Sequence, residues 1–401
     1  MTNEAAVRAE VRAFLSDHWR TDMPRAEWLP VAVDSGWAAP GFPEQWHGRG
    51  LTAELSRAAA SEFAAAGAPG GGQDAYNLWA NTVLAFGSDD LKRRFVRRLL
   101  LDDVAMCLLY SEPGAGSDLA GLQTAAVRDG DEWVVNGQKV WTSGGREAEF
   151  GMLIARTDWE QPKHKGITFF WLPMRQPGVE VRPLRQMTGD SRFNEVFFTD
   201  ARVSDANRVG ALNEGWRVLQ TALAYERAVM GVAYGGDDGP GSARERVGRA
   251  PSPGGSIPIP DLSLVKVAQE VGRAGEPAVR QALMHLHAMR TVNGWNAKRA
   301  AAALEQGTSS PLVSLGKLAM SGILHFAGHL HGELLGAEAM LDGPDNRRAA
   351  DANYSHHNAF FTSIGGGTDQ IQRNIIAERI LGLPREPEPD KGLPFRDIRT
   401  A

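Results

Sequence analysis

The run WVVNGQKVWTS at residues 133–143 marks the change from helix to strand in this chain. Apolar and aromatic residues flank Asn136-Gly137, and an Asn-Gly pair supplies the positive backbone angles that a tight two-residue turn requires. We therefore predict a β-hairpin whose turn lies at Asn136-Gly137. Further strand-like runs follow, and together they predict a β domain over residues 106–209. These runs are residues 167–172, 179–184 and 195–199.

Helical patterning fills the first hundred residues. Ser88 precedes two aspartates, and this arrangement predicts a helix start because a side-chain oxygen and acidic groups suit the free N–H groups and positive end of a helix. An apolar stripe of Leu91, Phe95 and Leu99 then recurs every four residues, opposite a basic face. We expect this basic face to be solvated rather than to bind an anion. It comprises Lys92, Arg93, Arg94, Arg97 and Arg98.

Helical patterning returns at Asn213 and continues to Leu381, where Gly382 and Pro384 give a stop signal. Residues 235–260 interrupt it with a segment rich in Gly, Pro and Ser, which we interpret as a mobile loop. The predicted fold is therefore an α+β multidomain protein. Its parts are an N-terminal helical domain at 1–105, a central β domain at 106–209 and a C-terminal helical domain at 210–401.

Composition narrows the class of protein. A chain of 401 residues is too long for one ordinary core. The net charge of −5 gives no broad basic surface, so we expect no nucleic-acid partner. The single cysteine, Cys107, leaves no intramolecular disulfide and favours a reducing compartment. We find neither the apolar run of a signal peptide nor a stretch of membrane-spanning length, and expect a soluble cytoplasmic protein without a membrane partner.

Three segments could bind a cofactor. The run SEPGAGSD at residues 111–118 combines hydroxyl groups with glycines such as Gly116, which let a planar or phosphorylated ligand approach the backbone. It lacks the third glycine of a nicotinamide fingerprint. Trp141-Thr142-Ser143 offers an aromatic plate and two hydroxyls. Gly365-Gly366-Gly367-Thr368 leads into a predicted helix from Asp369, whose N-terminus exposes N–H donors; Thr368 could equally be a plain helix cap.

The order and content of three runs resemble the signatures of the acyl-CoA dehydrogenase family. They are residues 111–118, residues 136–143 (NGQKVWTS) and residues 367–374 (GTDQIQRN), and the similarity spans nearly the whole chain. The resemblance implies a helical domain, a β-barrel-like domain and a four-helix bundle through which subunits pair. It also implies FAD as cofactor, an acyl-CoA substrate and an electron-transfer flavoprotein or similar acceptor. The implied assembly is a homodimer or homotetramer, with a hetero-oligomer as the alternative.

The resemblance also implies roles for matching residues. Ser111 resembles the hydroxyl residue that bonds the flavin ring, and Trp141 and Ser143 resemble residues that pack on it and bond to it. Ser117 resembles a residue near the cofactor and the pantetheine arm of the substrate. Thr368 and Gln370 match positions that reach FAD phosphate and adenosine groups, often from a neighbouring subunit. The Arg-x-x-Phe element of many members is not visible, and its region coincides with residues 235–260.

The position of the catalytic base departs from the commonest pattern. Dehydrogenation needs a carboxylate to take the α-proton while flavin N5 accepts a hydride from the β-carbon. In many family members this Glu directly precedes the Gly-Thr pair, where this chain has Gly366. The backbone N–H of Gly366 can still polarise the thioester carbonyl as negative charge develops on it.

A second family solution places the base on the first helix of the C-terminal domain, directly before an Arg, and Glu226-Arg227 matches it. Glu226 falls on the apolar stripe of that helix, where a carboxylate is disfavoured unless it is paired or used in chemistry. The stripe comprises Trp216, Leu219, Leu223 and Met230. We predict that Glu226 is the base and that Arg227 holds the substrate or tunes Glu226. The alternative is a structural ion pair between Glu226 and a nearby cation.

The sequence is also compatible with other sites, activities and substrates. His325 and His329 have a spacing that could bind a metal, but no further ligand supports it, so we expect these histidines and His331 to pack between helices and predict no metal. Glu333 falls where relatives contact the partner's FAD, or it faces solvent. The chain could also be a flavin oxidase or monooxygenase, or a weakly or non-catalytic subunit of a hetero-oligomer. Linear, branched, aromatic and steroid-like acyl groups, on CoA or a carrier protein, all stay open.

Overall fold

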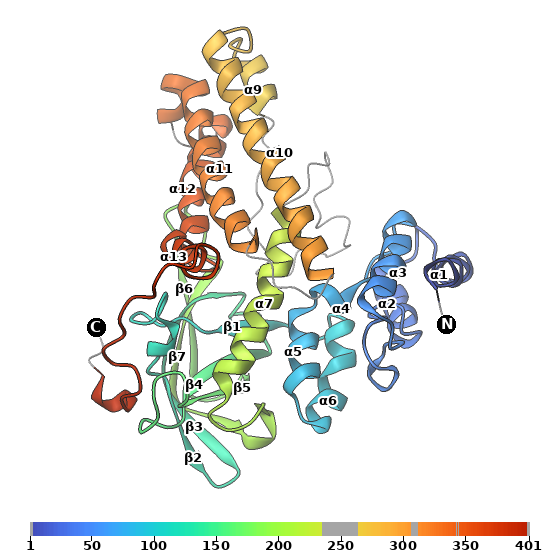
Figure 1. The fold of residues 1–401 in the computed structure, drawn as a ribbon, viewed down its shortest axis with the longest axis vertical. Helices are drawn as coiled ribbons and strands as arrows, with labels where there is room; N and C mark the ends of the chain where they lie inside the picture. The colour runs from blue at the N-terminus through green and yellow to red at the C-terminus, as the bar shows by residue number, and fades with distance from the viewer. Residues whose placement is uncertain (1–2, 235–263, 306–311, 342, 344, 399–401) are drawn as a thin grey trace.

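The computed structural model describes residues 3–234, 264–305, 312–341, 343 and 345–398. The predicted loop at 235–260 therefore lies outside the described residues. Figure 1 shows the β domain at the lower left of the molecule, with the N-terminal helices beside it and the C-terminal helices extending upward from it. The order of helices, strands and helices confirms the predicted fold class.

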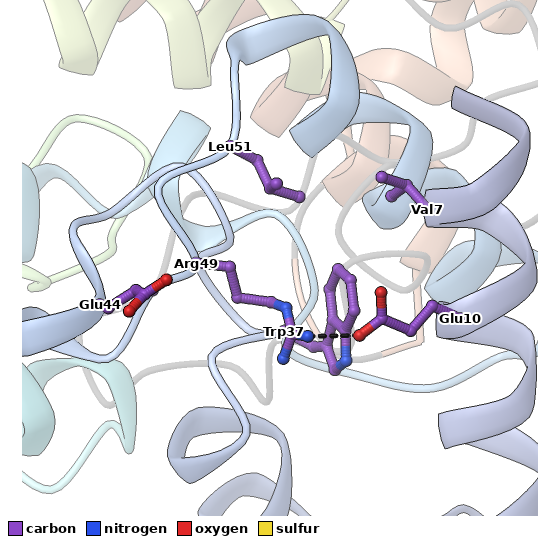
Figure 2. Close-up of a pocket in the computed structure, with 7 residues that line it drawn as sticks. Val7, Glu10, Trp37, Glu44, Arg49 and Leu51 are labelled. Atoms are coloured by element: carbon purple, nitrogen blue, oxygen red, sulfur yellow. Dashed lines mark hydrogen bonds and ion pairs between the residues drawn. The ribbon is translucent and has the colours of Figure 1, made fainter. Parts of the chain in front are cut away.

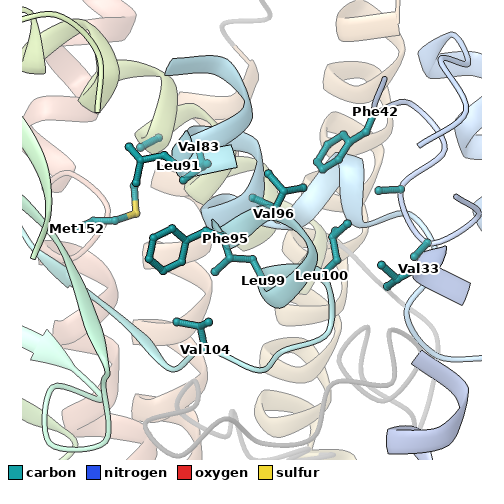
Figure 3. Packing of buried hydrophobic residues seen from close by; sticks show 14 of the residues in the cluster. Val33, Phe42, Val83, Leu91, Phe95, Val96, Leu99, Leu100, Val104 and Met152 are labelled. Carbon is teal, nitrogen blue, oxygen red and sulfur yellow. The ribbon is translucent and has the colours of Figure 1, made fainter. Parts of the chain in front are cut away.

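The N-terminal helices pack on one face of the sheet. The predicted cap is confirmed, because the Ser88 hydroxyl accepts a hydrogen bond from the Leu91 N–H at 3.2 Å at the start of α6. Phe95 of α6 contacts the rings of Phe150 and Trp171 in the sheet, and Figure 3 shows the buried residues around it. The helices are α1 (Glu4–His18), α2 (Arg25–Asp34), α3 (Ala53–Ala65), α4 (Gln73–Tyr76), α5 (Leu78–Phe86) and α6 (Asp89–Leu100).

The basic face of α6 is partly solvated and partly ion-paired. Arg94 pairs with Asp90 at 2.8 Å and Arg97 with Asp34 at 2.8 Å. Such exposed pairs stabilise a fold by about 0–1 kcal/mol each. Their acidic partners, Asp90 and Asp34, belong to the protein itself.

Eight strands form one mixed sheet in the order β6-β7-β3-β2-β4-β5-β8, with β1 beside β4. Side chains of β5 alternate between two cores: Phe169 and Trp171 face the N-terminal helices, whereas Phe170 and Leu172 face the interior of the β domain. The strands are β1 (Met106–Leu109), β2 (Ala125–Asp129), β3 (Glu132–Ser143), β4 (Phe150–Arg156), β5 (Ile167–Pro173), β6 (Val179–Leu184), β7 (Phe193–Ser204) and β8 (Arg208–Val209).

The predicted turn at Asn136-Gly137 is wrong. β3 runs through these residues without a break, and the hairpin turns at Gly130-Asp131, where Asp129 pairs with Glu132. Asn136-Gly137 instead forms a bulge against β7. Gly137 has a φ of 149°, and a Cβ there would lie 2.6 Å from the Thr124 hydroxyl oxygen. The positive backbone angle is therefore used to bend a strand rather than to reverse the chain.

The C-terminal helices are α7 (Gly215–Tyr234), α9 (Leu264–Glu270), α10 (Pro277–Glu305), α11 (Leu312–Leu335), α12 (Arg347–Ile364) and α13 (Asp369–Arg379). α9 to α12 lie along one another (Figure 1), and α13 packs against α11. α7 contacts α4, α5, β5 and α11, so it lies where the three parts of the molecule meet. No helix among the described residues has the length and apolar character needed to cross a membrane.

The end of the chain returns to the β domain. Phe395 is buried with its ring 3.5 Å from the guanidinium carbon of Arg156, and its N–H donates to the Gln161 carbonyl at 3.0 Å. Arg156 in turn donates to the carbonyl oxygens of Ala120 at 2.7 Å and Leu122 at 3.2 Å. Burial lowers the pKa of Arg156 to about 10. These contacts connect the C-terminal tail to the segment that follows the SEPGAGSD motif.

Candidate active site

Ser111 and Trp141 lie beside each other because their segments are hydrogen-bonded. The Ser111 carbonyl accepts from the Val140 N–H at 2.9 Å. A second bulge in β3, between Lys139 and Thr142, gives Trp141 a φ of 63°. A bulky residue in this left-handed region costs about 1–3 kcal/mol, and such strain is concentrated at functional sites. The bulge therefore sets the backbone direction at Trp141, whose side chain is partly exposed, with 55% of the residue accessible.

The SEPGAGSD motif forms a tight turn followed by an open loop. Glu112 and Ala115 exchange two backbone hydrogen bonds of 3.0 and 3.1 Å. Gly116 and Ser117 are exposed beyond this turn, and a Cβ at Gly116 would meet no atom within 4 Å. Asp118 is held by Lys163 at 3.1 Å. The loop therefore presents backbone N–H groups and a hydroxyl on the surface, with space for a ligand beside them.

A buried ion pair that sequence reasoning did not single out supports this loop. Lys139 is fully buried, and its ammonium group donates to Glu112 Oε1 at 2.7 Å and to the Tyr110 carbonyl at 3.0 Å. Burial lowers the pKa of Lys139. Burial alone would raise the pKa of Glu112, but Lys139 and the hydrogen bonds from Thr124 and Gln123 hold it below its usual range.

The glycine-rich entry to α13 has the predicted form. The Thr368 hydroxyl caps α13 by accepting from the Ile371 N–H at 3.2 Å. Gly366 and Gly367 have φ values of 67° and 87°, which favour glycine. The first turn of α13 therefore offers free N–H donors and the positive end of the helix to an anion, while Gln370 is exposed in the same turn.

An aromatic cluster brings the two halves of the site together. The Trp141 ring packs edge-on against Phe193 of β7 at 5.9 Å between centroids. Phe193 contacts Phe361 of α12 at 5.5 Å. A Cβ at Gly365 would lie 3.0 Å from the Phe361 ring. The exposed indole and the entry to α13 are thus neighbours through three rings, although more than 200 residues separate them in the sequence.

Polar contacts with α11 fix the position of α13. Asp369 accepts from Lys317 at 3.2 Å and from Ser321 at 2.8 Å, both on α11. Ser363 is 2.8 Å from the Ser321 hydroxyl and 2.6 Å from His325 Nε2. His325 therefore belongs to a helix-packing network, as expected.

The other histidines of α11 differ from each other. His331 is buried, as predicted, whereas His329 is exposed and lies 3.3 Å from the equally exposed Glu333. The expectation that His329 packs between helices is therefore wrong, because position 329 falls on the outer face of α11. No group of three His, Cys, Asp or Glu residues among the described residues could hold a metal ion.

Glu226 and Arg227 lie within α7, but their side chains are outside what the structure describes. The same stripe one to two turns earlier is buried, since Leu219 and Ala222 belong to the core shared with the N-terminal helices. Tyr225 is half-buried, and burial, with a smaller contribution from Asp74, raises its pKa. The helix that contains Glu226 thus packs into the junction of the three domains.

A cavity of about 430 Å³ lies elsewhere, in the N-terminal helical part. Figure 2 shows Arg49 stacked on the Trp37 ring, with 3.9 Å to its centroid, and paired with Glu10. None of the residues singled out from the motifs lines this cavity. We therefore assign the candidate active site to the β domain, α7 and α13 rather than to this hollow.

Comparisons with known proteins agree with this arrangement. The models for the N-terminal, middle and C-terminal domains of acyl-CoA dehydrogenase match residues 2–102, 107–201 and 262–381. The acyl-CoA dehydrogenase IpdE1 of Mycobacterium tuberculosis is 34% identical, over 94% of this chain and 97% of its own length. This chain belongs to the acyl-CoA dehydrogenase family. Its members are FAD flavoproteins that oxidise acyl-CoA thioesters, and the chain is an oxidoreductase of this class.

Two solved structures have the same fold. The Tcur3481–Tcur3483 steroid ACAD is 26% identical with a TM-score of 0.70, covering 96% of this chain and 98% of that one. The ChsE4–ChsE5 complex of Mycobacterium tuberculosis is 30% identical with a TM-score of 0.65, covering 96% and 99%. The name of each structure joins two proteins.

Proposed function

We propose that this chain holds FAD between the β domain and the entry to α13 and removes hydrogen from Cα and Cβ of an acyl-CoA. The observation that carries the proposal is the aromatic cluster that joins Trp141 to the Gly365–Thr368 segment. FAD requires an aromatic or hydroxyl-lined surface for its ring and N–H donors for its phosphates, and both are present. An exposed indole held at a positive φ supports the flavin side, and the capped N-terminus of α13 supports the phosphate side.

The residues that would hold FAD come from three elements. Ser111, Trp141 and Ser143 would bind and cover the flavin ring, and Gly116 and Ser117 would admit its polar edge. Ser117 would also contact the pantetheine arm of the substrate. Thr368 and Gln370 would reach the phosphates and adenosine, from this chain or from a second subunit. The geometric support is that Ser111 and Trp141 are fixed side by side by the Ser111–Val140 hydrogen bond.

The bound FAD would supply a hydride acceptor next to the β-carbon. Glu226 would take the α-proton, because α7 is the helix that reaches the junction of the three domains and position 226 lies on its apolar stripe. The backbone N–H of Gly366 would donate to the thioester carbonyl as negative charge develops there. Arg227 would hold the substrate or keep Glu226 oriented.

The acyl group, in this proposal, is bulky and alicyclic. The support is the steroid ACAD among the matched structures, at 26% identity over 96% of the chain. An electron-transfer flavoprotein or similar protein would reoxidise the cofactor. We also propose domain boundaries at 105/106 and 209/210, and a cytoplasmic location, which agrees with a single buried thiol.

A second candidate concerns assembly. Both matched structures named above are complexes of two different chains. If this chain also pairs with a different subunit, Thr368 and Gln370 could serve the partner's FAD. Purification with and without co-expressed partners, followed by measurement of bound flavin, distinguishes a self-sufficient enzyme from one half of such a complex.

The direct test is an anaerobic titration of the purified protein with acyl-CoAs while the flavin absorbance is recorded. The panel contains a steroid side-chain acyl-CoA, an alicyclic acyl-CoA and a straight-chain acyl-CoA. The proposal expects a yellow protein whose flavin band bleaches at the lowest concentration with the steroid or alicyclic compound. A protein that binds FAD but is bleached by none of them would contradict the proposed activity, and bleaching by the straight chain alone would contradict the substrate class.

A further inference from the structure

The Glu112 carboxylate closes a loop. Glu112 lies at the start of the SEPGAGSD turn, and its two oxygens accept from backbone N–H groups at the other end, Thr124 at 2.9 Å and Gln123 at 2.6 Å. The segment from 112 to 124 is thereby tied end to end by one side chain. It contains Gly116 and Ser117, whose exposed surfaces belong to the candidate FAD site. Closing a flexible segment in this way removes conformations that would compete with the binding geometry.

Lys139 ties the closed loop to the strand that contains Trp141. Its ammonium group bonds the Glu112 carboxylate and the Tyr110 carbonyl, on the residue directly before Ser111. Lys139 begins the bulge that gives Trp141 its positive φ. One buried pair therefore fixes three segments, and each of them contains a residue that would touch FAD.

A purely structural role would look different. A buried ion pair is a weak source of net stability, because removing two charges from water costs about as much as their attraction returns. A buried ion pair is easier to explain when it fixes the relative positions of the segments that it joins. Glu112 and Lys139 bond to each other and to backbone groups of Tyr110, Gln123 and Thr124, while Lys139 itself belongs to β3.

We infer that the Glu112–Lys139 pair is a positioning element that fixes the FAD-binding surface, by clasping the 112–124 loop and joining it to the Trp141 bulge. This inference rests on the proposed function. The two residues act through Ser111, Ser117 and Trp141, and neither is a catalytic residue.

The test compares FAD release from the holoenzyme and from Glu112→Gln, which keeps the size of the side chain and removes its charge. Flavin fluorescence after dilution gives the release rate, and hydrogen exchange gives the protection of residues 113–124. We expect Glu112→Gln to release FAD at least about ten times faster than the wild type, because hydrogen bonds to a charged group are weakened. The loop should also lose its protection from hydrogen exchange. Lys139→Gln should act similarly, and Glu112→Gln combined with Lys139→Gln should release FAD more slowly than the product of the two effects predicts.

Two control variants separate positioning from general stability. Val203→Ala removes buried volume from the core of the same domain without touching the loop, and Glu180→Gln breaks an exposed ion pair with Arg182. Both should release FAD at the wild-type rate. Equal release from Val203→Ala and Glu112→Gln, at matched loss of thermal stability, would overturn the inference, as would wild-type release and protection in Glu112→Gln. Wild-type protein that contains no FAD would instead overturn the proposed function on which the inference rests.

Discussion

The β domain and the C-terminal helices build their halves of the site differently. In the β domain, Ser111 and Trp141 are supported by a sheet whose strand β5 is buried on both faces and by a fully buried ion pair. The C-terminal helices leave large apolar side chains exposed, including Trp295 at 60% and Met284 at 59% on α10. The proposed flavin-ring half is therefore supported by contacts within one chain, whereas the helices next to α13 expose apolar surface. We propose that a second subunit covers part of this surface.

The largest effect should follow from breaking the support in the β domain. Lys139→Met leaves the Glu112 carboxylate buried without its cation, and we expect a loss of about 3–5 kcal/mol in the free energy of unfolding. Denaturant unfolding of the holoenzyme measures it. Arg182→Met is the matched control, because it breaks an exposed pair and should cost at most about 1 kcal/mol. Equal losses of unfolding free energy in both variants would show that breaking the buried pair costs no more than breaking the exposed pair.

The same pair gives stability a dependence on pH. Because the pKa of Glu112 is held below its usual range, the carboxylate stabilises the fold fully above the unfolded-state pKa, about 4.3. This contribution is lost as pH falls through the lower folded-state pKa. The advantage of the wild type over Glu112→Gln in unfolding free energy should therefore shrink below about pH 4. An advantage that stays constant into the acid transition would contradict the assigned charge state.

Association should respond to the exposed surface of the C-terminal helices. Trp295→Ser on α10 removes a large exposed apolar side chain of the kind that dominates interfaces, and we expect association to weaken by about 2 kcal/mol, or roughly thirtyfold. Val127→Ser is the matched control, since Val127 is similarly exposed at 63% but lies in the β domain. Light scattering over a dilution series measures both. Equal changes in association for the two variants, or no change in either, would contradict the proposed contrast between the two regions.

The smallest effect on stability is expected at two helix caps that have the same geometry. Thr368→Ala and Ser88→Ala each remove a hydroxyl that accepts from an N–H three residues on, at 3.2 Å. Each should lower stability by about 1 kcal/mol. Only Thr368→Ala should also speed FAD release, because only that cap lies at the proposed phosphate site. Identical FAD release from both variants would reduce Thr368 to an ordinary cap.

Local signals in the sequence predicted local structure well. The caps at Ser88 and Thr368 and the strands at 167–172 and 179–184 depend on neighbours in the chain, so patterns of a few residues identify them. The Asn136-Gly137 turn failed because the same backbone angle also serves a bulge. The choice depended on β7, whose Asp200 bonds the Asn136 side chain from 64 residues away.

Long-range partners of the site could not be predicted in this way. No pattern of a few residues marks Lys139 as buried, and its partner Glu112 lies 27 residues earlier. The Phe193–Phe361 contact that joins the two halves of the site spans separate domains. The sequence does contain one signal for this ion pair, which is the presence of a glutamate and a lysine inside two adjacent family motifs. Their burial follows from the packing of the whole sheet, which no short window contains.

In the proposed mechanism, Glu226 on α7 supplies the base, rather than position 366. Anaerobic stopped-flow mixing with the acyl-CoA that bleaches the wild type tests it most directly, because it isolates the reductive half-reaction from the electron acceptor. Glu226→Gln should keep a wild-type content of FAD and bleach at least about a thousandfold more slowly, given what general-base catalysis contributes. Bleaching at the wild-type rate in Glu226→Gln would remove this residue from the mechanism and contradict the account.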